Sequence, residues 1–217
     1  MKKIQVAPSM LSADFANLAK DIELVNQYAD IIHLDIMDGV FVPNISYGTP
    51  VIQAVTNRAT IPVEAHLMIV EPQKFLKEYR DFGINSISVH YEACVHLDRV
   101  VNQIKELGMK AGVAITPHTS AYNIEHIVTV ADYILVMSVN PGYSGQKYIP
   151  YTTQKIAQVK SIIEKNNPNC LIEVDGGVGL SNINEIAQAG ADVVVAGNAV
   201  FGAENPADVI RKLQVTL

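Results

Sequence analysis

The chain has 217 residues, with 16 Lys and Arg against 22 Asp and Glu, which gives a formal net charge of −6. Hydrophobic residues make up 49% of the sequence and charged residues 18%, so a large core is expected and disorder is not. The acidic balance, without a cluster of Lys or Arg, argues against nucleic acid as a partner, because phosphate backbones are bound by basic patches. No apolar run approaches the roughly 20 residues of a membrane span. We therefore expect a cytoplasmic protein with no membrane partner.

The two cysteines, Cys94 and Cys170, lie far apart in the sequence and belong to no CxxC pair. This pattern fits neither a disulfide framework nor a zinc ribbon. Both are expected to be reduced thiols that pack as small hydrophobic residues.

Short β-branched runs alternate with longer amphipathic segments along the whole chain. The runs predict eight strands, at Ile4–Met10, Ile31–Met37, Val63–Ile69, Ser86–His90, Ala111–Thr116, Tyr133–Val139, Leu171–Asp175 and Val193–Gly197. The segments between them predict helices at Phe15–Gln27, Pro72–Phe82, His96–Leu107, Thr152–Lys165, Ile183–Ala189 and Pro206–Leu213.

Eight strand–helix units in 217 residues leave about 27 residues each, enough for a strand, a three-turn helix and two short loops. Gly83, Gly108 and Gly190 each follow a helical segment, where a left-handed cap is expected. The pattern favours one closed (β/α)8 barrel of the TIM type over residues 1–217. The alternative is an open doubly wound sheet, but its GxGxxG nucleotide signature is absent after the first strand.

The active site of such a barrel lies at the carboxyl ends of its strands, where this sequence places several polar residues. Alternation puts His33 and Asp35 on one face of the second strand. His66 shares a face with Glu64 on the third strand, and Asp175 ends the seventh. Two imidazoles and two carboxylates at similar depth favour a divalent metal with nitrogen and oxygen ligands over isolated core residues.

Asp35 and Asp175 also suggest acid–base chemistry. Two carboxyls that face each other across a substrate are able to remove a proton from one side and supply one to the other. This requires different protonation states, which a shared metal and mutual repulsion would produce.

Glycines gather in the loops after the sixth, seventh and eighth strands. These loops contain Gly142-Tyr143-Ser144-Gly145, Gly176-Gly177 and Gly197-Asn198. Together they predict a phosphate site made mostly of backbone amides. Three methionines near strand ends, Met37, Met68 and Met137, fit either core packing or a dry wall around the reacting carbon.

With these residues identified, the sequence resembles the ribulose-phosphate 3-epimerase family over nearly its whole length. The resemblance is carried by Ala7–Ser9, the run HLDIMDGVFVPN from His33 to Asn44, His66–Met68, Met137–Gly142, Glu173–Val178 and Val200–Gly202.

The resemblance implies a ribulose-phosphate-binding type of barrel that interconverts D-ribulose 5-phosphate and D-xylulose 5-phosphate at C3 through an enediolate, in the pentose phosphate pathway. It further implies that His33, Asp35, His66 and Asp175 hold one divalent ion per chain, Zn²⁺ or Fe²⁺ first, with Mn²⁺ and Co²⁺ as alternatives. Asp35 and Asp175 would be the catalytic acid–base pair, while Ser9 and His66 would contact the substrate. The glycine loops with Asn198 would bind the phosphate, and the chain is expected to form a homo-oligomer.

Three positions depart from the family pattern. Ser144 replaces a usual glycine, which would cost about 1 kcal/mol if the position required a positive φ. Asn198 replaces a usual serine, and Glu64 replaces a usual aspartate that would help to orient His66. These departures bear on substrate affinity, not on the reaction.

Three alternative functions fit parts of this pattern. A D-allulose-6-phosphate 3-epimerase would use the same residues. A lysine-dependent lyase or decarboxylase needs a Lys at a strand end, which the second, third and seventh strands do not have. A non-catalytic sugar-phosphate-binding barrel would not need both aspartates and both histidines.

Overall fold

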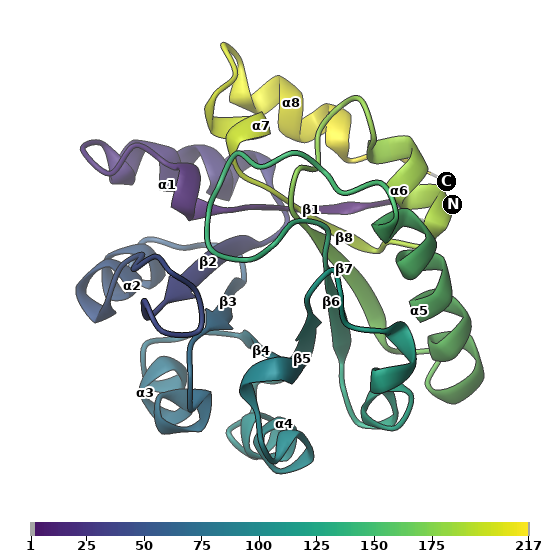
Figure 1. The fold of residues 1–217 in the computed structure, drawn as a ribbon. Coiled ribbons are helices and arrows are strands. Elements are labelled where there is room, and N and C mark those ends of the chain that lie inside the picture. The colour runs from purple at the N-terminus through teal and green to yellow at the C-terminus, as the bar shows by residue number, and fades with distance from the viewer. Residues whose placement is uncertain (1–2, 217) are drawn as a thin grey trace.

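A computed structural model describes residues 3–216 and contains one parallel sheet of eight strands (Figure 1). The strands are β1 (Gln5–Pro8), β2 (Ile32–Met37), β3 (Val63–Met68), β4 (Ser86–His90), β5 (Lys110–Ile115), β6 (Tyr133–Met137), β7 (Leu171–Asp175) and β8 (Val193–Ala196). Their order, β1-β8-β7-β6-β5-β4-β3-β2, bends the sheet into a nearly closed barrel. All eight predicted strands are confirmed, and the fold is the expected (β/α)8 barrel.

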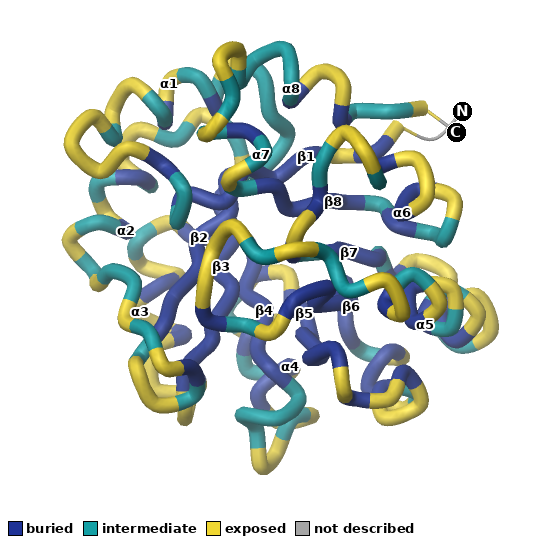
Figure 2. The backbone as a smooth tube through the Cα atoms, turned by 45° about the horizontal axis from the view of Figure 1, so that its top comes forward, coloured by how far each residue is buried: buried dark blue, intermediate teal, exposed yellow. Residues whose placement is uncertain are grey.

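Helices surround the strands and turn their exposed sides to solvent (Figure 2). They are α1 (Leu18–Tyr28), α2 (Thr49–Thr56), α3 (Leu76–Asp81), α4 (Leu97–Glu106), α5 (Thr152–Asn166), α6 (Ile183–Ala189), α7 (Asn198–Phe201) and α8 (Pro206–Leu213). No helix within residues 3–216 is long and apolar enough to cross a membrane.

The helices differ from the prediction in three places. The segment Pro72–Phe82 divides into a 3-10 turn at Pro72–Lys74 and the short helix α3. After β5, where no helix was predicted, the chain forms two 3-10 turns, Ala121–Ile124 and Ile127–Thr129. The helices α2 and α7 were not predicted. The three glycine caps are confirmed, since Gly83, Gly108 and Gly190 all have positive φ.

The barrel closes between β1 and β2 in an unusual way. An isolated parallel bridge joins Ser9 to His33. Farther along β2, side chains from the following loop satisfy its free edge. The amide of Asp35 donates to the Tyr47 hydroxyl at 3.0 Å, and the amide of Met37 donates to the Ser46 hydroxyl at 3.0 Å. The Ser46 hydroxyl in turn donates to the carbonyl of Asp35 at 2.7 Å. Loop side chains therefore replace part of the strand ladder at this seam.

The register of β2 against β3 sets the depth of the polar residues. Cα partners across this pair include His33 with Glu64, and Asp35 with His66. The strand residues between them, such as Leu34, belong to the apolar core shared with the helices. Alternation thus places the polar side chains inside the barrel, as predicted.

Candidate active site

The four predicted metal ligands meet at one end of the barrel interior. One ligand atom from each of His33, Asp35, His66 and Asp175 lies within 4.8 Å of the others. His33 Nε2 lies 3.3 Å from Asp35 Oδ1, and His66 Nδ1 lies 3.2 Å from the same oxygen. His66 Nδ1 also lies 3.7 Å from Asp175 Oδ2. The sequence prediction of a common depth therefore agrees with the geometry.

This group of four side chains, which we call the metal group, has the chemistry of a cation site. His33 Nε2 is buried and has no hydrogen-bond partner. Its other ring nitrogen, Nδ1, lies 2.6 Å from Glu64 Oε1. Burial lowers the pKa of His33, but the charge of Asp35 and the polar contacts with Asp35, Glu173 and Glu64 raise it well above its usual range. The surroundings thus favour positive charge at this point, and a divalent ion would supply it.

Glu64 and Glu173 lie beneath the metal group on the side of His33. Glu173 Oε1 lies 3.3 Å from His33 Nδ1, and both glutamates are buried. Burial and the neighbouring Glu64 raise the pKa of Glu173 well above its usual range. Glu64 therefore orients His33 and not His66, which corrects the sequence expectation. The cause is the register, because Glu64 faces His33 directly across the β2–β3 ladder.

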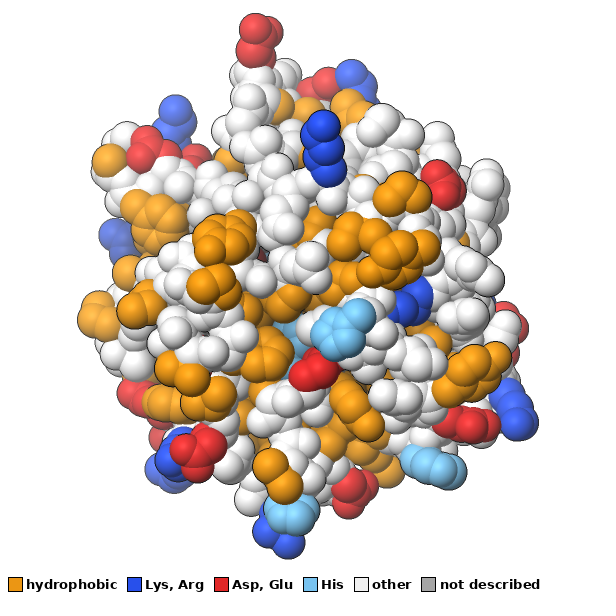
Figure 3. Space-filling view, viewed as in Figure 1, with side chains coloured by type: hydrophobic (Ala, Val, Ile, Leu, Met, Phe, Trp, Pro, Cys, Tyr) orange, Lys and Arg blue, Asp and Glu red, His pale blue; other side chains and the backbone are white. Residues whose placement is uncertain are grey.

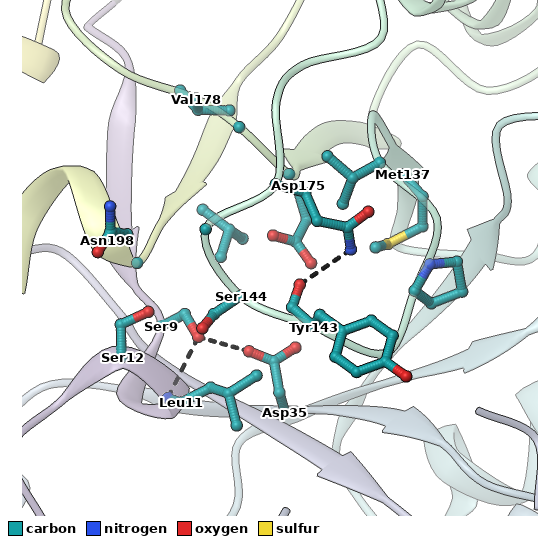
Figure 4. A pocket seen from close by; sticks show the side chains of 18 of the residues that line it. Ser9, Leu11, Ser12, Asp35, Met137, Tyr143, Ser144, Asp175, Val178 and Asn198 are labelled. Carbon is teal, nitrogen blue, oxygen red and sulfur yellow. Dashed lines mark hydrogen bonds between the residues drawn. The ribbon is translucent and has the colours of Figure 1, made fainter. Parts of the chain in front are cut away.

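The two candidate acid–base residues differ in protonation. Burial raises the pKa of Asp35, but the charges and hydrogen bonds of His33 and His66 outweigh it and hold the pKa well below its usual range. Burial, followed by repulsion from Asp35, raises the pKa of Asp175 to about 7. The two carboxyls enter the pocket from opposite sides (Figure 4). One ionised carboxyl, Asp35, and one carboxyl with a pKa near neutrality, Asp175, thus face the same space.

A pocket of about 260 Å³ opens above the metal group. This is below the volume of sites for drug-sized ligands and suits a small metabolite. Its lining includes Ser9, Asp35, Asp175, the three methionines Met37, Met68 and Met137, and the predicted loop residues Gly142, Tyr143, Ser144, Gly145, Gly176, Gly177, Gly197 and Asn198. His33 and His66 are fully buried and do not line it. The pocket therefore offers both aspartates, but not the two imidazoles, to a ligand.

Comparison with known proteins places this site in a family. The model of the ribulose-phosphate 3 epimerase family matches residues 5–201. A ribulose-phosphate 3-epimerase of Aquifex aeolicus is 45% identical over 210 residues, covering 96% of this chain and 95% of the relative. Another, of Bacillus subtilis, is 45% identical over 213 residues, covering 97% of this chain and 98% of the relative. The chain belongs to the ribulose-phosphate 3-epimerase family.

Solved structures support the fold independently of the family. An orotidine 5′-monophosphate decarboxylase from Methanocaldococcus jannaschii superposes with a TM-score of 0.69 at 18% identity, covering 98% of this chain and 97% of that one. At this identity the likeness concerns the barrel alone.

Two departures from the epimerase family pattern are now located in the pocket. Ser144 does not have a positive φ, so the anticipated backbone strain is absent. Asn198 is exposed at the start of α7 and lines the pocket.

The loops after β6 and β7 pack directly against each other, because Gly176 and Gly177 have no side chain to hold them apart. A Cβ at Gly177, where φ is +65°, would lie 2.3 Å from the backbone nitrogen of Tyr148. A Cβ at Gly176 would lie 2.5 Å from Val139 Cγ2. Glycine is required here because the two backbones approach too closely for any side chain.

Figure 3 shows blue Lys and Arg side chains around the edge of this face and a few nearer its middle. None of the described residues that line the pocket is a Lys or Arg, so backbone amides, hydroxyls and side-chain amides are its neutral polar groups.

Sequence reasoning missed several residues of this epimerase-family site. Ser12 lines the pocket beside Gly197, and its hydroxyl is buried without a hydrogen-bond partner. Gln146 also lines the pocket, and its amide donates to the carbonyls of Asn140 and Tyr143. His90 contacts His66, with 2.9 Å between their Nε2 atoms. A histidine at the end of the predicted strand Ser86–His90 was a signal of the same kind as His33.

Ser9 takes part in the site through Asp35. Its hydroxyl donates to Asp35 Oδ2 and accepts from the amide of Leu11 at 3.3 Å. Both contacts are drawn in Figure 4. Ser9 thus holds the carboxyl of Asp35 while it also lines the pocket.

Proposed function

We propose that this protein inverts C3 of a ketose phosphate, interconverting D-ribulose 5-phosphate and D-xylulose 5-phosphate in the pentose phosphate pathway. The observation that carries the proposal is the pair of opposed carboxyls, Asp35 with a lowered pKa and Asp175 with a pKa of about 7. Family membership and relatives named as ribulose-phosphate 3-epimerases support the substrate class.

The proton transfers follow from the positions of these two carboxyls. Inversion next to a carbonyl removes the C3 proton from one face and returns another proton to the opposite face. Ionised Asp35 accepts the proton in one direction, and protonated Asp175 supplies one from the other side. In the reverse direction the two roles exchange. Hydrogen bonding from Ser9 holds Asp35 in place for both directions.

The metal group fits a divalent ion, because two nitrogens and two carboxylate oxygens converge around the unpartnered His33 Nε2. His33, His66, Asp35 and Asp175 would hold this ion. When bound, it would polarise the substrate carbonyl and stabilise negative charge on oxygen. The donor set suits Zn²⁺ or Fe²⁺, with Mn²⁺ and Co²⁺ also compatible. Glu64 orients His33 toward the site through its contact with Nδ1.

The phosphate would bind at the loops after β6, β7 and β8. These loops supply backbone amides at Gly176, Gly177 and Gly197, and the Asn198 side chain adds an amide donor. Ser12, whose hydroxyl lacks a partner, lies beside Gly197 and supplies a further donor. A buried hydroxyl without a partner is costly, so a ligand oxygen at this place would satisfy it.

The experiment is a coupled epimerase assay in deuterated water, with metal content measured on the same preparation. The product should carry solvent deuterium at C3, because the donor carboxyl exchanges with solvent between turnovers. Product without solvent label would refute the two-carboxyl mechanism. The ratio of kcat/KM on D-ribulose 5-phosphate and D-allulose 6-phosphate would establish the length of the sugar. A cytoplasmic location and a homo-oligomeric state stay predictions.

A further inference from the structure

A chain of side chains leads away from the metal group toward the rim of the barrel. His66 Nε2 lies 2.9 Å from His90 Nε2, and His90 Nδ1 lies 3.1 Å from Glu92 Oε2. His66 is on β3 and His90 is on the adjacent strand β4, and both are fully buried. The proposed reaction uses neither His90 nor Glu92.

The outer end of this chain is fixed by donors from the segment after β5. Glu92 Oε1 accepts from the amide of Thr116 at 2.9 Å, from the Thr116 hydroxyl at 2.9 Å and from the Thr119 hydroxyl. Burial raises the pKa of Glu92, but hydrogen bonds with His90, Thr119 and Thr116 lower it to about 2. Glu92 is therefore an ionised acceptor at neutral pH and has no proton to donate to His90.

The direction of every proton in the chain follows from this acceptor. The neutral His90 ring carries one proton, on one of its two nitrogens. That proton must be on Nδ1, which faces the carboxylate, so His90 Nε2 is an acceptor. His66 then donates its own proton from Nε2. Its Nδ1 is left bare, and this is the nitrogen that faces Asp35 and Asp175.

We propose that Glu92 and His90 are positioning residues that fix the tautomer of His66, so that its Nδ1 lone pair is directed at the metal. The inference rests on the proposed metal site and goes beyond it, because it assigns a role to two residues outside that site. Partners of this kind commonly fix the orientation and tautomer of histidine ligands.

The variant Glu92→Gln tests this proton order with little change in shape. The backbone N–H of Thr116 can only donate a hydrogen bond. The oxygen of the new glutamine side chain therefore has to occupy the position of Glu92 Oε1. The new NH₂ group then faces His90 Nδ1 and needs an acceptor there. His90 would move its proton to Nε2, and His66 would carry its proton on Nδ1, where it blocks the metal.

The matched control is Thr119→Val. It removes one of the three donors to Glu92 Oε1 but keeps the carboxylate and the fixed amide of Thr116, so the proton order is retained. If Glu92 served only to anchor the segment after β5, both variants would behave alike.

The experiment measures the Zn²⁺ dissociation constant of the full chain by competition with a chelator. The expected result is 10- to 100-fold weaker binding for Glu92→Gln, the usual range for loss of such a partner, and less than threefold for Thr119→Val. Equal binding by Glu92→Gln and wild type would overturn the proposal, and so would equal weakening in both variants. Wild type that binds no Zn²⁺ would overturn the metal site and this proposal together.

A second measurement needs no variant. In the Zn²⁺-loaded wild type, nitrogen–proton correlation spectra of the histidine rings should show the His90 proton on Nδ1. A proton on His90 Nε2 would overturn the proposal even if the metal site is correct.

Discussion

Replacing Asp175 with asparagine should separate the two proton transfers of the reaction. The change keeps the size of the side chain but removes its negative charge and its ability to exchange a proton. The side chain is 15% exposed, and burial with repulsion from Asp35 keeps its pKa at about 7, so wild type at neutral pH contains a proton donor at this position. Loss of one positioned acid–base group typically lowers kcat by about 10²- to 10⁴-fold, or about 3–5 kcal/mol of barrier.

The structure also predicts what survives in Asp175→Asn. Asp35 stays ionised, because His33 and His66 hold its pKa low. Asp35 should still remove the C3 proton of the epimer that carries this proton on the face toward Asp35. It should then return a proton to the same face. In deuterated water that epimer should gain label at C3 without inversion. Asp35→Asn should give the mirror result with the other epimer.

The assay follows label at C3 and inversion on the same samples, with metal content matched to wild type because both residues are proposed ligands. Asp98→Asn, an exposed change on α4, is the control and should leave both rates unchanged. Inversion within tenfold of wild type in Asp175→Asn would refute the two-carboxyl reasoning. Loss of exchange from both epimers with the metal retained would refute it as well.

Three further predictions concern other parts of the molecule. Asn198→Asp places a negative charge at the proposed phosphate site and should raise KM at least tenfold. The same change at the exposed Asn169 is the control and should leave KM unchanged. Equal KM values for the two variants would show that Asn198 does not bind the phosphate. Because the folded pKa of Glu92, about 2, is below its unfolded value, its contribution to stability is present above pH 4.5 and is lost as the pH falls. Denaturant unfolding of the metal-free protein should therefore show wild type losing about 2 kcal/mol more than Glu92→Gln between pH 5 and pH 3, and parallel curves would contradict this. Burial raises the pKa of Cys94 and of Cys170 to about 12, so both thiols should react far more slowly with iodoacetamide at pH 8 than a free cysteine does, by mass spectrometry.

The strands and the metal group were predictable because alternation is a local property. In His33–Met37 every second residue is polar or a methionine, and a strand must then place these side chains on one face. Parallel strands end at the same side of the barrel, so a common depth for Asp35, His66 and Asp175 followed from the sequence alone.

The helix α2 was not predictable from periodicity. Its sequence, from Thr49 to Thr56, is rich in β-branched residues that favour strands in isolation. It forms a helix because Pro50 suits the first turn and because Ile52 and Val55 are buried in the core. Tertiary packing overrides local preference here.

The connection from His66 through His90 to Glu92 was also beyond sequence reasoning. No local sequence pattern around any of these three residues indicates that they contact one another. Their contact depends on the register of β3 against β4 and on the fold of the segment after β5, which periodicity had assigned to no particular structure. The sequence predicts which strands carry polar residues, but not which nitrogen faces which oxygen.

The seam between β1 and β2 links the completion of the fold to the assembly of the site. Closure there brings Ser9 to Asp35, and the hydroxyls of Ser46 and Tyr47 take positions that a neighbouring backbone occupies elsewhere in the barrel. A chain that has paired β2 through β8 and docked β1 on β8, but has not closed this seam, would lack the Ser9 contact that holds one catalytic carboxyl. Activity thus reports on whether this seam is closed. A circular permutant with its new termini between β1 and β2 would lose few backbone hydrogen bonds. It should nevertheless lose catalytic activity, because the contact of Ser9 with Asp35 depends on closure of this seam.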